Sequence, residues 1–221
     1  PSPRPRARRA PTRGTTAAAA SRHGMRRAAG AAPYHASVIA TAFGRLRLAD
    51  AHAHLFSDRF FRALAAQMKP PPAEGEVTAA LRARLDWEFP DPDPARLAGR
   101  WVAELDRHGV DRTVLIASVP GDEGSAAAAA RAHPDRIAGY FMLDPTAPDA
   151  GARADRAMGE MGLRGVCLFP AMHKFSPDED RVRPVLEAAR RRRAVVFVHC
   201  GELKVGVRER LGLPSPFDLA R

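Results

Sequence analysis

Long hydrophobic runs are missing from this 221-residue sequence. The longest strongly apolar segment, residues 194–200, is far shorter than the roughly 20 residues that a membrane-spanning helix needs. Cysteine is also scarce, because Cys167 and Cys200 are the two that occur, and neither lies in a CxxC pair that could build a disulfide framework or a zinc knuckle. We therefore expect no membrane partner and a protein of a reducing compartment, the cytoplasm.

Acidic residues are absent from the first 49 positions, which contain ten arginines and no lysine. The formal net charge of the whole chain is +10, with 35 basic and 25 acidic residues. Subtracting the ten early arginines leaves 25 basic residues against 25 acids from Asp50 onward. A neutral body argues against a broad phosphate-binding face, so we do not expect nucleic acid to be its partner.

Residues 1–45 show no sustained hydrophobic periodicity and are rich in proline, alanine and arginine. This composition predicts a disordered basic tail. Three roles stay open for it: a targeting peptide, translated sequence upstream of a start at Met25, and an arginine-rich arm for nucleic acid. Residues 46–221 form the second part that we expect, a folded domain.

From Leu46 onward, short apolar segments alternate with segments of helical spacing. Five segments are typical of buried strands: 46–53, 113–117, 137–143, 165–169 and 194–199. Helices are predicted at 59–68, 77–87, 94–108, 125–133 (with Ser125 as its cap), 150–161 and 178–192. The later strands start about 25–30 residues apart, the size of a minimal β-α unit. The alternation predicts an α/β protein with a parallel sheet covered by helices.

Two architectures fit this pattern, a doubly wound open sheet and a (β/α)8 barrel. A dinucleotide-binding open sheet carries a glycine-rich turn after its first strand, whereas AHAHLF stands here at residues 51–56. We therefore predict a (β/α)8 TIM-barrel type. Five units are present, and about 250 residues are typical of a whole barrel. We expect the last three units to lie beyond Arg221.

The chemistry-bearing signal is Asp50-Ala-His52-Ala-His54 at the end of the first strand. Because side chains alternate along a strand, these three are expected to point the same way, and two imidazoles on one face can hold one metal ion. His199 ends the fifth strand, at the mouth where barrel enzymes place their chemistry. The three histidines together predict a metal site, although each alone is also typical of an ordinary buried histidine.

Several further segments, in the same order, make the chain similar to a known superfamily. They are DAHAHLF (50–56), ELDRHGVDRTVLIASVPGD (104–122), AHPDRIAGYFMLDP (132–145), MGLRGVCLFPAMHKFSPDE (161–179) and VVFVHCGE (195–202). With them the chain resembles the amidohydrolase superfamily, in particular the amidohydrolase-related branch that includes aminocarboxymuconate semialdehyde decarboxylase. The resemblance runs from Asp50 to about residue 219 and has no counterpart for the tail.

The resemblance implies that His52, His54 and His199 ligate a divalent metal, usually zinc. It also implies a histidine after strand six and an aspartate after strand eight, which include the expected acid/base and lie beyond this sequence. The implied function is that of a metal-dependent hydrolase or lyase, which hydrolyses, decarboxylates or hydrates a small organic substrate such as a carboxylate. Zinc would activate a water or polarise a carbonyl group.

Two residues are weaker candidates for substrate binding. His173 follows the fourth strand and Glu202 follows His199, both where mouth loops form. Asp50 can orient a ligand histidine, but a structural role is the simpler interpretation. A homo-oligomer is left open. The rival hypothesis is a non-catalytic or degenerate barrel that acts only through partner binding.

Overall fold

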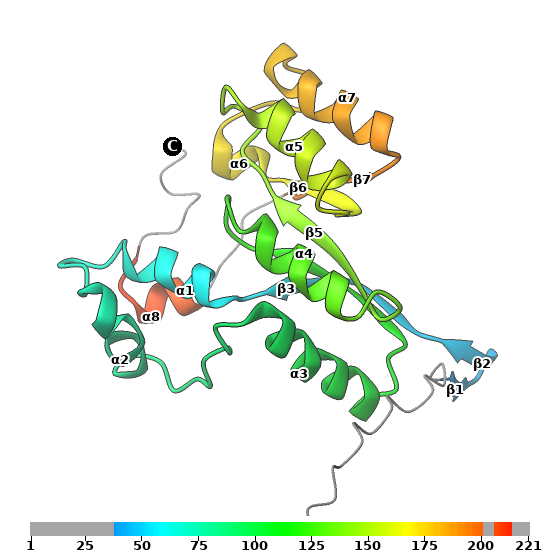
Figure 1. The fold of residues 1–221 in the computed structure, drawn as a ribbon, viewed down its shortest axis with the longest axis horizontal. Coiled ribbons are helices and arrows are strands. Elements are labelled where there is room, and N and C mark those ends of the chain that lie inside the picture. Colours follow the sequence, from blue (N-terminus) through cyan, green and yellow to red (C-terminus); the bar gives the residue numbers. More distant parts are fainter. Residues whose placement is uncertain (1–37, 201–205, 214–221) are drawn as a thin grey trace, which may run out of the picture. The chain divides into compact units, whose positions relative to one another are not determined.

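The computed structural model describes residues 38–200 and 206–213. They belong to one compact unit, residues 36–221. These residues form a five-stranded sheet, flanking helices and a separate two-stranded hairpin (Figure 1). No helix within the described ranges combines the length and the apolar character that crossing a bilayer requires.

The sheet is parallel, and its strands follow one another in chain order. The strands are β3 (Ala49–Leu55), β4 (Arg112–Ala117), β5 (Ile137–Met142), β6 (Gly165–Leu168) and β7 (Val195–Val198). Each crossover therefore steps to the next neighbour on the same side, as a barrel requires, whereas a doubly wound sheet reverses its strand order at a switch point. The structure confirms the predicted partial (β/α)8 fold with five strands.

Helices connect and cover the strands (Figure 1). They are α1 (Asp58–Ala65), η1 (Glu74–Glu76), α2 (Val77–Arg82), α3 (Pro94–Arg107), α4 (Glu123–Ala132), α5 (Ala150–Gly159), α6 (Pro170–His173), η2 (Asp180–Val182), α7 (Arg183–Arg192) and α8 (Gly206–Arg210).

Several boundary predictions were wrong. The first strand of the sheet begins at Ala49 and not at residue 46, because residues 46 and 47 belong to the hairpin strand Gly44–Arg47. The helix predicted at 77–87 ends at Arg82, and η2 and α7 together occupy the stretch predicted as one helix at 178–192. Ser125 does not cap α4, because the helix begins two residues earlier and the Ser125 hydroxyl instead donates to Asp122 at the N-cap position, 2.6 Å away.

A β-hairpin precedes the barrel sheet. Its strands, β1 (Val38–Thr41) and β2 (Gly44–Arg47), pair antiparallel, and Gly44, the first residue of β2 after the turn, has a φ of +100°. The expectation of disorder was therefore wrong for residues 38–45, where β-branched side chains favour strand and a glycine permits the tight turn. Arg47 also binds the buried Asp111 carboxylate and so ties the hairpin to the barrel. Residues 1–37 lie outside the described ranges, and disorder there stays a prediction.

The sheet is apolar on both faces. Leu115, Phe141 and Val166 face the helices and join the larger core cluster, which includes three buried alanines of α4. The neighbours of these strand residues form a second cluster on the opposite, concave face: Ile116, Met142, Cys167 and Phe169, with Val114, Tyr140, Met172 and Phe197 against them. This two-sided burial explains why the strands read as continuous apolar segments in the sequence.

Glycine is required where α4 lies on β5. A Cβ at Gly139 would lie 2.5 Å from Leu163 Cδ2 and 3.0 Å from the carbonyl oxygen of Ala126. The leucine methyl can rotate away, but the helix backbone cannot. The small residues on both elements therefore set the distance between this helix and the sheet.

Replacement of Gly139 by alanine should lower the free energy of unfolding by about 1–3 kcal/mol, because the added methyl overpacks the contact with Ala126. Urea unfolding followed by circular dichroism measures this change. Gly124→Ala is the matched control, because nothing lies within 4 Å of its Cβ position and α4 should gain helix propensity. Equal stability of the two variants would contradict the proposed tight packing.

Candidate functional site

The histidine-bearing strand β3 contains a bulge. Its register with β4 runs Ala49↔Arg112, Asp50↔Thr113, Ala53↔Leu115, His54↔Ile116 and Leu55↔Ala117. Three residue steps along β3 thus match two along β4. This extra residue breaks the regular alternation of β3 side chains between the two faces of the sheet. Asp50 pairs with Thr113, which lies on the same face of β4 as Leu115, the face toward the helices. His54 pairs with Ile116, which lies on the concave face. The prediction that Asp50 points with the histidines was therefore wrong.

Asp50 has a local structural role instead. Its carboxylate Oδ1 accepts the backbone N–H of His52 at 2.9 Å. This contact satisfies a backbone donor inside the bulge, where the regular ladder is interrupted. Asp50 therefore shapes the strand that carries the histidines, in line with the structural interpretation of its sequence position.

His52 and His54 lie side by side at the end of β3. Their Nε2 atoms are 3.1 Å apart, and their ring centroids are 5.0 Å apart. Two nitrogens bound to one ion at about 2.0–2.1 Å, with an angle of 90–110° between them, are about 2.9–3.4 Å apart. The pair therefore has the spacing of two ligands of one metal ion.

The environment of His54 favours its neutral imidazole. Burial lowers the pKa of His54, and the neighbouring charges of His52 and His199 lower it further. A metal ligand must be the neutral imidazole, because the lone pair binds the ion. The electrostatic surroundings thus agree with the spacing of the two Nε2 atoms.

His199 follows β7, the other outer strand of the described sheet. Its backbone N–H donates to the Leu168 carbonyl at 2.9 Å, and its ring stacks on Phe169 at 5.0 Å between centroids. The Phe197 ring meets His52 edge-on at 4.7 Å. Among residues 38–200 and 206–213, no three His, Cys, Asp or Glu side chains are grouped closely enough to hold a metal ion. The structure pairs His52 with His54, and the set of three stays a prediction.

His173 lies at the end of α6, directly after β6. Its ring meets Phe169 edge-on at 6.5 Å, so Phe169 contacts both His173 and His199. Within the described part of the chain, its buried Nδ1 atom has no hydrogen-bond partner. Burial lowers the pKa of His173, while the charge of Asp144 opposes that shift. Glu202, the other substrate-binding candidate, lies outside the described residues.

Sequence reasoning missed Ser118, the residue directly after β4. Its Oγ atom lies 2.9 Å from His54 Nδ1 and 3.0 Å from the carbonyl oxygen of Ile116. The one signal in the sequence is its place at the end of a buried strand, beside the strand that carries the histidines. A serine there is too common to be singled out without the register.

A second missed group joins the loops that follow β3 and β4. The buried Asp122 carboxylate accepts the hydroxyls of Ser57 and Ser125, each at 2.6 Å. Ser57 is also the N-cap of α1, since its Oγ accepts the Phe60 backbone N–H at 3.1 Å. Burial raises the pKa of Asp122, and the two hydroxyl hydrogen bonds oppose this shift. The group fixes the two loops that flank His54.

Comparison with protein families identifies the chain. The amidohydrolase family matches residues 49–220. The chain belongs to this family. No match was found among curated proteins.

Two solved decarboxylases share the fold. The 5-carboxyvanillate decarboxylase of Sphingomonas paucimobilis is 21% identical with a TM-score of 0.51, over 74% of this chain and 55% of that one. The enzyme of Novosphingobium aromaticivorans, solved with manganese and 4-hydroxy-3-methoxy-5-nitrobenzoic acid, is 16% identical with a TM-score of 0.53, over 77% of this chain and 56% of that one. This member of the amidohydrolase family thus spans little more than half the length of these structures.

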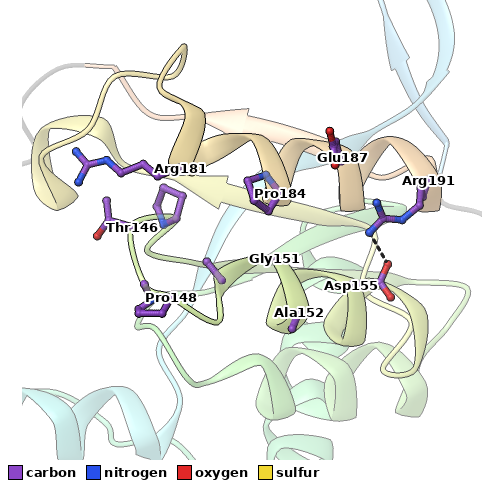
Figure 2. Close-up of a pocket in the computed structure, with 12 residues that line it drawn as sticks. Thr146, Pro148, Gly151, Ala152, Asp155, Arg181, Pro184, Glu187 and Arg191 are labelled. Carbon is purple, nitrogen blue, oxygen red and sulfur yellow. Dashed lines mark hydrogen bonds and ion pairs between the residues drawn. The ribbon is translucent and has the colours of Figure 1, made fainter.

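A groove of about 550 Å³ lies on the helical layer of the domain, between α5 and α7. Figure 2 shows Asp155 paired with Arg191 at one end and Thr146 near Arg181 at the other. Its acidic and basic side chains balance, and Thr146 is bonded to Asp144. None of the histidines lines it, so this groove is separate from the candidate site.

The two cysteines should differ sharply in reactivity. Burial on the concave face raises the pKa of the Cys167 thiol to about 12, whereas Cys200 is exposed. Since the thiolate is the reactive form, one thiol per chain should react with Ellman's reagent within minutes at pH 8, and the second only after unfolding in urea. Cys200→Ser should remove the fast phase. Fast reaction of both thiols in the native protein would show that the concave face is open.

Proposed function

We propose that this member of the amidohydrolase family supplies the first part of the active site of a metal-dependent hydrolase or lyase. His52, His54 and His199 are the proposed ligands, and zinc is the proposed ion. The observation that carries the proposal is the 3.1 Å spacing of the His52 and His54 Nε2 atoms at the carboxyl end of a barrel strand. Manganese in a structural neighbour supports a divalent ion and makes manganese the alternative.

A divalent ion held here would supply Lewis acidity toward a carbonyl or carboxylate oxygen and would activate water. The chain's own residues prepare the site for it. Burial lowers the pKa of His54 and so favours its neutral form, and the rings of Phe197 and Phe169 pack against His52 and His199. The acid/base group that moves the proton is proposed to lie beyond Arg221.

The proposed substrate is a small organic molecule that carries a carboxylate. Decarboxylases of an aromatic acid among the structural neighbours support this class, while hydrolysis of a C–N or C–O bond remains the alternative reaction. His173 is proposed to bind the substrate through a ring nitrogen, because its Nδ1 has no partner among the described residues. Glu202 is proposed as a second contact, and the cytoplasm as the location.

Metal binding tests the ligand assignment directly. The full chain, freed of metal, should bind close to one zinc ion in isothermal titration calorimetry. His52→Ala should weaken binding at least 100-fold, because a lone imidazole on β3 cannot chelate. His108→Ala is the matched control, since His108 is exposed at the end of α3 beside Glu104. Unchanged affinity of the His52 variant would refute the assignment.

Turnover separates the enzyme from the rival hypothesis of a non-catalytic barrel. Because the expected acid/base group lies beyond Arg221, residues 1–221 alone are expected to bind metal without turnover. Zinc-loaded or manganese-loaded protein extended through the expected strand-six histidine and strand-eight aspartate should release carbon dioxide from members of a panel of aromatic carboxylates, or hydrolyse lactones and amides of similar size. His52→Ala should abolish that turnover. Metal binding by the extended protein with no turnover across the panel would favour the partner-binding alternative. That alternative also has some support, because β3 and β7 each pair on one side only within the described sheet.

A further inference from the structure

The hydroxyl of Ser118 makes two contacts that together decide where its single proton lies. Its Oγ is 3.0 Å from the Ile116 carbonyl oxygen and 2.9 Å from His54 Nδ1. A carbonyl oxygen can only accept, so the contact with Ile116 takes the hydroxyl proton. The lone pairs of Oγ are then left to face His54.

The position of the Ser118 proton also decides which ring nitrogen of His54 is protonated. A neutral imidazole carries one N–H, on Nδ1 or on Nε2. Because Ser118 Oγ offers only lone pairs, the 2.9 Å contact is a hydrogen bond only when Nδ1 carries the proton. Nε2 then holds the free lone pair, and Nε2 is the atom that lies 3.1 Å from His52 Nε2.

We propose that Ser118 is a positioning residue that holds His54 in its Nδ1–H form and so presents the Nε2 lone pair to a divalent metal. The inference rests on the proposed function and deepens it, since it names the group that prepares one ligand before an ion arrives. Asp50, the carboxylate nearest in sequence, is bound to the strand backbone instead. A neutral hydroxyl thus does here what a carboxylate or carbonyl does beside many ligand histidines.

Ser118 is well placed for this role because the surrounding backbone is fixed. It is 8% exposed, and it follows the strand that is in register with His54 through Ile116. The hydrogen bond from Ser57 to Asp122 joins the loop after Ser118 to the loop after His54. The loops on both sides of the contact are therefore joined to each other.

The tautomer is measured in the metal-free full chain, labelled with ¹⁵N-histidine, by two-dimensional NMR at pH 8. His54→Gln assigns the signals. The wild type should show the Nδ1–H form of His54, and Ser118→Ala should shift it to Nε2–H or to a mixture. Ser118→Thr, which keeps the hydroxyl, should retain the Nδ1–H form. Ser176→Ala is the matched control, because the Ser176 hydroxyl hydrogen-bonds to Asp178 and belongs neither to the His54 contact nor to the Asp122 group.

Zinc affinity is then measured on the same variants. Ser118→Ala should bind zinc about tenfold more weakly than the wild type, as expected for loss of a group that orients a ligand, and Ser118→Thr should restore the affinity. Circular dichroism verifies that each variant is folded. An unchanged His54 tautomer in Ser118→Ala, or an Nε2–H form in the wild type, would overturn the role of Ser118. Absence of zinc binding by a wild type with the expected tautomer would instead overturn the proposed metal site, and with it the metal-presenting part of this role.

Discussion

The pairing of β3 with β4 is the constraint on which the candidate site depends. Parallel strands in chain order bring their carboxyl ends to one edge, so His54, Ser118 and the loop to Asp122 meet there although they are far apart in sequence. The bulge after Asp50 resets the alternation just before the histidines. A shift of one residue would send His54 toward the helices and Ala53 toward the concave face.

Packing on the two faces of the sheet keeps that register. Toward the helices, small residues such as Gly139 and Ala126 allow a close approach that larger side chains would block. Toward the concave side, Phe169 and Phe197 fill space and at the same time contact His199 and His52. The aromatic residues that complete the core therefore also form the walls of the candidate site, which couples its geometry to the packing of the sheet.

Much of the fold could be predicted because its signals are local and repeated. A strand buried on both faces needs an apolar side chain at nearly every position, and Thr113–Ala117 is such a segment. The hairpin of residues 38–47 was not predicted, because its strands are short and largely exposed and lie in an arginine- and alanine-rich region. The bulge was not predicted either, because strict alternation of side chains is the default expectation for a strand. Nothing in the sequence marks the hydrogen bond in which the Asp50 carboxylate accepts the backbone N–H of His52.

Some parts of the candidate site depend on local sequence, and others depend on the pairing of strands across the sheet. The spacing of His52 and His54 is set within one strand, so a HxH pattern at a strand end is enough to predict it. Ser118 becomes visible only through register, since nothing near it in sequence marks it as a neighbour of His54.

Of the three histidines, His199 depends most on the sheet as a whole. It comes from β7 while the pair comes from β3, and these are the two outer strands of the described sheet. Its approach to the pair therefore depends on the curvature that accumulates over all five strands. The spacing of the pair depends on the pairing of β3 with β4, whereas the position of His199, the proposed third ligand, depends on every strand between β3 and β7.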